Sequence, residues 1–163
     1  MKKTHLVKLQ DFTCNPQGEV GRNILAFGSK VQTIEPVSQA LNRKFNRNDL
    51  LTYCSDSENS DLSCVISVLG WGGMRYDHAA MLFDHWDDLK PIVNQLLNGQ
   101  IHSRREAYSE LQKLRLQGKV PGMGIAYYTK LICFLAPDLN GFILDQWTGK
   151  STNLIYGDKL VMI

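Results

Sequence analysis

The feature that most constrains the fold of this chain is the turn Pro121-Gly122-Met123-Gly124, which lies between two helix-forming segments. Glycine adopts backbone conformations that other residues avoid, so the chain can reverse direction within four positions. Ser103 and Glu106 have the spacing of a capping box, which predicts a helix over 103–116. An apolar run over 125–135, followed by a proline, predicts a second helix. The local prediction is therefore helix, short hairpin, helix.

This hairpin unit, residues 103–135, has a chemical consequence. At the open N-terminus of its second helix, unpaired backbone N–H groups and the helix dipole attract an anion. The amides in question belong to Gly122, Met123, Gly124, Ile125 and Ala126. A phosphate can approach glycine backbone closely because glycine has no side chain. A lone Gly-x-Gly is also the pattern of an ordinary turn, so the motif by itself does not decide between the two.

An aspartate, Asp145, follows the hairpin after one helix and a short loop over 138–141. It precedes Gln146-Trp147, where a further helix is expected to begin. One interpretation is that Asp145 caps this helix, a role that aspartate fills well. The other is that its carboxylate is directed back toward the hairpin and takes part in chemistry.

The hairpin Val120-Pro121-Gly122-Met123-Gly124 together with Asp145 resembles the signature of the helix-hairpin-helix DNA glycosylases, most closely their 8-oxoguanine DNA glycosylase-like branch. In that signature a Leu/Val-Pro-Gly-x-Gly hairpin is followed, after one helix and a loop, by a catalytic aspartate. The motifs cover about a fifth of the chain. The resemblance implies a catalytic role for Asp145 and a phosphate held by the hairpin amides. Lys119, in the basic segment before the hairpin, is expected to contribute to the same contact.

The chain departs from this family at one position. Bifunctional members carry a nucleophilic lysine two residues after the second hairpin glycine, where this chain has Ala126. The nearest lysine, Lys130, lies one helical turn later on the same face, and a turn rises about 5.4 Å, which an extended lysine can span. We therefore hypothesise that Lys130 delivers its amine into the site. The alternatives are a monofunctional enzyme, in which Lys130 holds DNA or a carboxylate, and a solvent-facing lysine.

The loop Gly70-Trp71-Gly72-Gly73-Met74-Arg75 is a second candidate for substrate contact. In the family the corresponding segment supplies residues that wedge into the duplex, so the resemblance implies that Trp71, Met74 and Arg75 are wedge or pocket residues. A buried tryptophan beside a helix-stopping glycine cluster is the structural alternative. Weaker candidates for lining a base pocket are Tyr127, Cys133 and Trp147.

Charge is distributed unevenly along the chain. The net charge is only +2, but residues 1–50 carry eight basic and four acidic side chains, and residues 101–150 carry seven and four. Residues 51–100 carry two and seven. This asymmetry suits a surface that faces phosphates, and it is also typical of ordinary solvated helix faces.

Cysteine and histidine spacing predicts no metal site. The four cysteines, Cys14, Cys54, Cys64 and Cys133, lack paired ligand spacing, and none follows Asp145, where some family branches hold an iron–sulfur cluster. We therefore expect no metal and no cofactor. Scattered thiols without a signal peptide predict a cytoplasmic protein, and no apolar run is long enough to span a membrane.

The rest of the chain predicts an all-α fold in a single helix-hairpin-helix glycosylase-like domain over 1–163, with an irregular N-terminal arm over 1–35. We expect the arm to contain a short strand or helix over 22–27 and to form one wall of a base pocket. We also expect the C-terminal residues 160–163 to pack back onto the domain. The helices expected besides those of the hairpin unit cover 36–46, 61–69, 76–83, 89–97 and 145–155.

The function expected from the resemblance is a DNA glycosylase that flips a modified, 8-oxoguanine-like base from double-stranded DNA and cleaves its N-glycosidic bond, with lyase activity if Lys130 is the nucleophile. Two other functions remain open. One is a DNA-binding module that has lost catalysis. The other is an antiviral defence enzyme acting on a modified nucleobase, since small proteins resembling this branch occur in bacterial defence gene clusters. The sequence leaves the target base and the oligomeric state undetermined.

Overall fold

The computed structural model describes residues 18–156, and the regular structure in that range is helical apart from one isolated antiparallel bridge between Val20 and Phe45. The prediction of an all-α fold is confirmed. The first 17 residues of the predicted arm and the predicted packing of residues 160–163 lie outside the described residues. The α-helices are α2 (Ile24–Val31), α3 (Arg47–Ser55), α4 (Asp61–Trp71), α5 (Tyr76–Phe83), α6 (Trp86–Leu97), α7 (Arg104–Leu116), α8 (Ile125–Leu135) and α9 (Gln146–Tyr156), with 3-10 turns η1 (Gln39–Leu41) and η2 (Pro137–Leu139).

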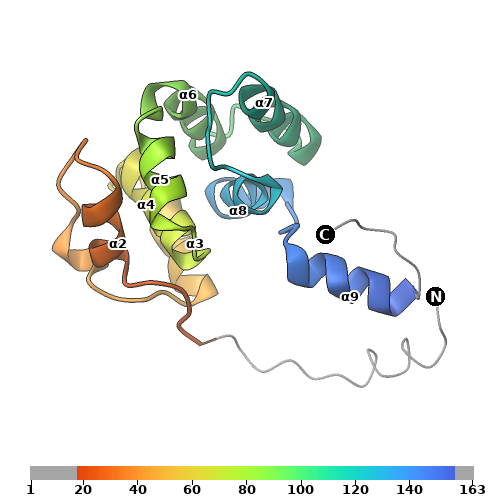
Figure 1. The fold of residues 1–163 in the computed structure, drawn as a ribbon, viewed down its shortest axis with the longest axis horizontal. Helices are drawn as coiled ribbons and strands as arrows, with labels where there is room; N and C mark the ends of the chain where they lie inside the picture. The colour runs from red at the N-terminus through yellow and green to blue at the C-terminus, as the bar shows by residue number, and fades with distance from the viewer. Residues whose placement is uncertain (1–17, 157–163) are drawn as a thin grey trace.

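Helix α8 lies at the centre of the fold and contacts α3, α4, α6 and α7 (Figure 1). Every residue from Tyr128 to Leu135 is buried, so this helix is covered on all sides rather than along one stripe. A lysine on such a helix must bury its charge, and the burial is costly unless the charge is paired. The position of α8 therefore decides the environment of Lys130.

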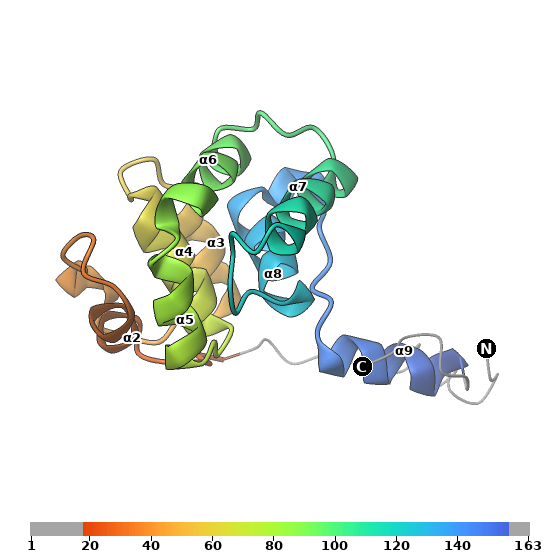
Figure 2. The same cartoon turned by 45° about the horizontal axis from the view of Figure 1, so that its top comes forward.

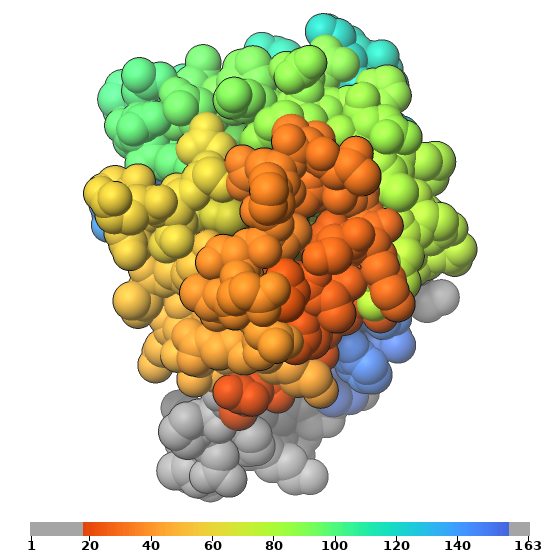
Figure 3. Space-filling model, turned by 90° about the vertical axis from the view of Figure 1, so that its left-hand side faces the viewer, coloured from red at the N-terminus to blue at the C-terminus, as the bar shows by residue number. Residues whose placement is uncertain are grey.

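Helix α4 is the second buried helix, and it packs against α8 and α2. All its residues from Leu62 to Trp71 are buried. Residues 18–50 spread over one face of the molecule, between α5 on one side and the α3–α4 loop on the other (Figure 3). This segment crosses the end of α4, where the backbone amide of Arg22 donates to the carbonyl of Gly70.

The predicted helix over 36–46 is wrong. Ser38 caps only the short turn η1, and Phe45 is extended where it pairs with Val20. The helix begins at Arg47 instead, because Asn46 and Asp49 form a reciprocal capping box. The apolar spacing in this segment reflects burial of Leu41 and Phe45 from irregular backbone.

Most of the other predicted helices are confirmed, with shifted ends in several cases. The predictions 76–83 and 125–135 agree with α5 and α8, and Ser103 caps α7 as expected. The predicted helix 89–97 begins earlier, at Trp86, because the indole is buried in the core. Pro91 therefore lies inside α6 rather than in its first turn, which corrects the prediction.

Helix α9 lies apart from the other helices in both ribbon views (Figure 1; Figure 2). Gly149 is its one buried residue among those described. No helix in residues 18–156 is long and apolar enough to cross a membrane. Asp145 caps the beginning of α9, where its carboxylate accepts the backbone amides of Trp147 and Thr148.

Candidate active site

The hairpin between α7 and α8 has the geometry that the sequence predicts. Gly122 has a φ of +72°, in the left-handed region that favours glycine. A Cβ built on Gly122 would lie 2.8 Å from Cβ of His78, so the hairpin is packed closely against α5. Gly124 is the N-cap of α8 and makes no side-chain cap hydrogen bond. A Cβ built on it would have no neighbour within 4 Å among residues 18–156, so this part of the protein leaves the helix N-terminus open to a ligand.

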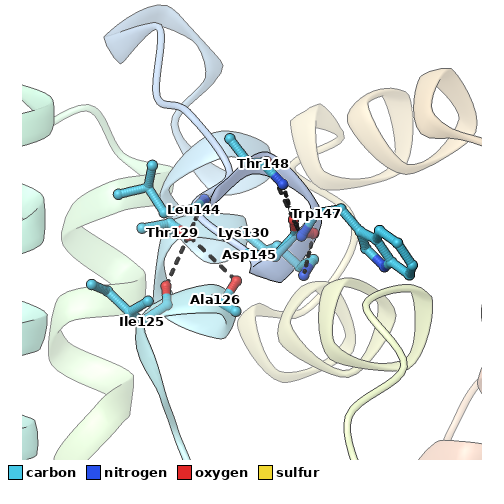
Figure 4. A network of polar contacts seen from close by, with 8 residues as sticks. All are labelled: Ile125, Ala126, Thr129, Lys130, Leu144, Asp145, Trp147 and Thr148. Atoms are coloured by element: carbon cyan, nitrogen blue, oxygen red, sulfur yellow. Dashed lines mark hydrogen bonds and ion pairs between the residues drawn. The ribbon is translucent and has the colours of Figure 1, made fainter. Parts of the chain in front are cut away.

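Lys130, in the second turn of α8, forms an ion pair with Asp145, the residue that precedes α9. The Lys130 Nζ lies 3.5 Å from Oδ2 of Asp145, and the two side chains are 9% and 25% exposed. Residues far apart in the sequence thus place a cation and an anion together at a mostly buried position (Figure 4). The burial of the Lys130 side chain rules out the interpretation of Lys130 as a solvent-facing lysine.

Asp145 uses its two carboxylate oxygens differently. Oδ1 accepts hydrogen bonds from the backbone amides of Trp147 and Thr148, at 3.0 Å each, and from the Thr148 hydroxyl at 3.2 Å. Oδ2 faces Lys130. Burial raises the pKa of Asp145, but the Thr148 and Trp147 hydrogen bonds and the Lys130 ammonium outweigh it, so the net pKa is lowered. Asp145 is therefore both a helix cap and an ionised partner of Lys130.

The turn at the end of α4 makes room for the Lys130 side chain. A Cβ built on Gly72 would lie 3.0 Å from Cδ and 3.5 Å from Cε of Lys130. Gly72 has φ −69° and ψ −5°, which any residue can adopt, so the requirement there is space rather than backbone conformation. The methylene chain of Lys130 therefore runs against a position without a side chain.

Thr129 connects α8 to the segment that leads into Asp145. Its hydroxyl donates to the carbonyl of Ile125 at 2.8 Å and accepts from the backbone amide of Leu144 at 3.1 Å. Thr129 is 3% exposed. Figure 4 shows this connection beside the Lys130–Asp145 pair.

Trp71 and Met123 are buried rather than displayed on the surface. Trp71 is 8% exposed and packs edge-on against Phe134, with ring centroids 4.9 Å apart. Its indole therefore does not project as a wedge. The alternative interpretation, a buried tryptophan beside a helix-stopping glycine cluster, describes its packing. Met123 is 2% exposed, and its backbone amide donates to the carbonyl of Val120, so neither its side chain nor its amide is available to a phosphate. Met74 is fully buried as well, so it does not project as a wedge.

Arg75 and Lys119 are exposed and paired with acids. Arg75 forms a two-pronged contact with Asp77, the shorter distance being 2.6 Å from Nη2 to Oδ2. Hydrogen bonding to Arg75 lowers the pKa of Asp77 to about 2. Lys119 Nζ lies 3.2 Å from Oδ1 of Asp88. Exposed pairs of this kind are weak, so a phosphate can compete for both cations.

The three weaker pocket candidates lie in different surroundings. Tyr127 is close to the pair, with its ring centroid 5.7 Å from Lys130 Nζ. Cys133 is buried and accepts a 3.3 Å contact from Arg47; burial raises the pKa of its thiol more than Arg47 lowers it. Trp147 is 66% exposed, and Lys150 Nζ lies 4.7 Å from its ring centroid. The structure therefore brings only Tyr127 close to Lys130.

Sequence reasoning missed the contributions of Gly72, Thr129 and Thr148. Thr148 lies three residues after a capping aspartate, which is a local signal for its hydrogen bonds to Asp145. Gly72 was singled out only as part of a glycine cluster. For Thr129 there is no local signal, because its partner Leu144 is fifteen residues away.

Two hollows are found on the described part of the molecule. One of about 260 Å³ lies between α7 and α8 and is lined in part by Arg104 and by Thr129 and Leu144, the residues next to the pair. The other, of about 590 Å³, lies at the far end of α8 and is lined in part by Asp56 and Asp138. Neither is lined by Lys130 or Asp145. In residues 18–156 no three His, Cys, Asp or Glu side chains come together as a metal site requires.

The structure thus defines an all-helical protein in which a helix–hairpin–helix unit is joined to a buried lysine–aspartate pair. Residues 22–155 match the model of the family described as "Putative 8-oxoguanine DNA glycosylase OGG-like protein". The chain belongs to this family, and membership indicates a DNA glycosylase-like protein. No curated protein and no solved structure gives a significant match to the chain.

Proposed function

We propose that the protein is a DNA glycosylase that extrudes a modified, 8-oxoguanine-like base from duplex DNA and cleaves its N-glycosidic bond at the Lys130–Asp145 pair. The observation that carries the proposal is the 3.5 Å approach of these two side chains at a buried position on α8. Extrusion is required because a base in a duplex cannot reach such a position, and unstacking it costs a few kcal/mol. Family membership supplies DNA as the substrate class.

In the first half of the reaction, the Lys130 ammonium releases a proton to water, and the amine so formed attacks C1′ of the sugar. The bond between C1′ and the base nitrogen breaks, and its electron pair leaves with the base, which takes up a proton. The attached nitrogen loses a proton, the bond between C1′ and the ring oxygen breaks, that oxygen takes up a proton, and a protonated Schiff base between C1′ and Lys130 remains. β-Elimination then removes a proton from C2′ to water and breaks the C3′–O bond, so the 3′ phosphate leaves with that electron pair and the strand is cleaved. In the monofunctional alternative, water attacks C1′ and the strand stays intact.

Asp145 stabilises the charge that develops in this step. The sugar becomes positive as the base departs, and an ionised carboxylate close to C1′ lowers the energy of that state. Its lowered pKa keeps Asp145 charged at neutral pH. The hydrogen bonds from Trp147 and Thr148 fix its orientation before substrate binds. Lys119 and the amides of Gly122, Gly124, Ile125 and Ala126 hold a phosphate nearby, whereas the Met123 amide already donates to the carbonyl of Val120.

The test uses duplexes that contain 8-oxoguanine, uracil, alkylated bases or phage-type modified bases. We expect base release from at least one of them, and borohydride should trap a covalent complex with the active substrate. Asp145→Asn and Lys130→Gln should each lower the single-turnover rate by at least about 100-fold. Lys113→Gln is the matched control, since Lys113 is exposed on α7 and pairs with Glu110.

Each outcome separates the candidate functions. Base release without trapping, with strands left intact, assigns the monofunctional reaction and removes Lys130 as the nucleophile. Binding to DNA without release from any duplex, unchanged in Asp145→Asn, assigns a DNA-binding module and refutes the enzyme. Release only from phage-type modified bases points to a defence role instead of repair.

A further inference from the structure

Two adjacent connections join α8 to the start of α9. Lys130 is paired with Asp145, and the residues immediately before them, Thr129 and Leu144, are joined by a 3.1 Å hydrogen bond. Only the first connection consists of groups that the proposed reaction uses. The second connection joins the hydroxyl of Thr129, which is buried, to the backbone amide of Leu144.

We propose that Thr129 is a positioning residue, which holds the Asp145 carboxylate in place when Lys130 leaves it to react. This inference rests on the proposed function, because it concerns the same pair. In the free protein the ion pair draws α8 and the start of α9 together. When the Lys130 ammonium gives up the proton that it must lose before attacking C1′, that attraction is lost, just before Asp145 has to stabilise charge on the sugar. The Thr129–Leu144 hydrogen bond does not involve either reacting group, so it persists through the step.

The geometry makes Thr129 suited to this role. Its hydroxyl hydrogen is directed to the carbonyl of Ile125, with a longer 3.3 Å contact to that of Ala126, which leaves an oxygen lone pair for the Leu144 amide. The same hydroxyl therefore bonds the first turn of α8, next to the phosphate-binding amides, and the residue before Asp145. The Thr129 hydroxyl therefore fixes the distance between the phosphate-binding amides of α8 and the Asp145 carboxylate. A displacement of about 1 Å in such a constellation can cost about 100-fold in rate.

The experiment compares Thr129→Val, which keeps the shape and removes the hydroxyl, with Thr129→Ser, which keeps the hydroxyl. Thr152→Val is the matched control, because the Thr152 hydroxyl donates to the carbonyl of Thr148 within α9 and, among residues 18–156, joins no other element. Single-turnover rates, DNA affinity and thermal unfolding are measured on the full chain. The Asp145 pKa is measured by carbon-13 NMR of its carboxyl group.

For Thr129→Val we expect a rate lower by about tenfold to 100-fold with DNA affinity within about twofold of wild type. The Asp145 pKa should rise toward its ordinary value as the carboxylate moves from Lys130, and Thr129→Ser should restore both. A valine variant with wild-type rate and Asp145 pKa would overturn the inference. So would a serine variant as impaired as the valine variant, or an equal effect of Thr152→Val.

Failure of this inference and failure of the proposed function give different results. If the wild-type protein releases no base from any duplex, the proposed function fails while the NMR titration still decides whether Thr129 positions Asp145. If wild type is active and the valine variant is unimpaired, only the positioning role fails.

Discussion

The two glycine-rich segments of this protein, Gly70–Gly73 and Gly122–Gly124, look similar in sequence but do different work in the structure. In the first, Gly72 lies against the Lys130 side chain, and space for a Cβ is taken by the methylene groups of that lysine. In the second, Gly122 packs against His78, whereas Gly124 faces open space at the N-terminus of α8. One segment makes room inside the protein, and the other leaves room for a ligand.

The comparison teaches that a glycine is informative only together with what would meet its side chain. The first segment resembled a DNA-wedging loop, yet Trp71 is buried and Gly72 serves Lys130. The second resembled an anion-binding hairpin, and Gly124 is open as such a site requires. Both segments lie next to α8. Gly72 contacts the side chain of Lys130, which the proposed reaction uses as nucleophile, and Gly124 is the N-cap where a phosphate would bind.

The largest effect is expected from Gly122→Ala. The substitution forces an alanine into a left-handed conformation and places its Cβ 2.8 Å from Cβ of His78. We expect a loss of about 2–4 kcal/mol in the free energy of unfolding, measured by urea denaturation. Gly118→Ala is the control, because Gly118 also has positive φ (+73°) but no neighbour within 4 Å. Equal losses in the two variants would show that the contact with α5 contributes nothing.

Gly72→Ala should affect reaction more than stability. The new Cβ has to displace Lys130 Cδ, from which it would lie 3.0 Å away, and so shifts the amine relative to Asp145. We expect the rate of borohydride trapping to fall about tenfold, with the free energy of unfolding within about 1 kcal/mol of wild type. Gly18→Ala is the control, since a Cβ there would meet no atom of residues 18–156 within 4 Å. Trapping at the wild-type rate would mean that Lys130 reaches its target without this space.

Gly124→Ala should weaken DNA binding without destabilising the fold. Gly124 has φ −88° and ψ 175°, which alanine adopts readily, and its Cβ would meet no protein atom. A methyl group there does, however, stand where a phosphate approaches the backbone. We expect DNA affinity to fall about threefold to tenfold, corresponding to the loss of about one hydrogen bond, measured by fluorescence anisotropy at fixed salt. Unchanged affinity would remove the hairpin from the DNA interface.

The smallest expected effect is the pH dependence of the reaction rate, which involves the Gly72 segment and not the hairpin. The hairpin from Val120 to Gly124 contains no titratable side chain. Gly72, by contrast, lies against Lys130, which is paired with Asp145. Because the pKa of Asp145 is lowered in the folded protein, the stability it contributes is present above its unfolded value of about 3.9 and is lost as pH falls through the lower folded value.

We therefore expect single-turnover rates between pH 7 and pH 4.5 to show no loss from protonation of Asp145, and an NMR titration should find its pKa below 3.9. In Lys130→Gln the pKa of Asp145 should move upward while the hydrogen bonds from Trp147 and Thr148 keep part of the lowering. A measured pKa at or above the ordinary value in the wild-type protein would contradict the ion pair.

Local sequence signals determined much of this protein. The capping residue Ser103, the hairpin glycines and the apolar runs defined α5, α7 and α8, because caps, turns and helical periodicity act over a few neighbouring residues. The family signature directed attention to Asp145, and helical spacing to Lys130. The same local reasoning failed over 36–46, where apolar residues at helical spacing are buried from irregular backbone and the cap at Asn46 was overlooked.

Tertiary structure alone decided which of these residues meet. The 3.5 Å pairing of Lys130 with Asp145 requires α8 to be covered on all sides, so that the lysine is buried and needs a partner. The space at Gly72 comes from packing α4 against α8, and the Thr129–Leu144 bond from the return of the chain along α8. Such contacts join segments distant in sequence, and no local pattern encodes them, because their strength depends on burial that only the folded chain creates.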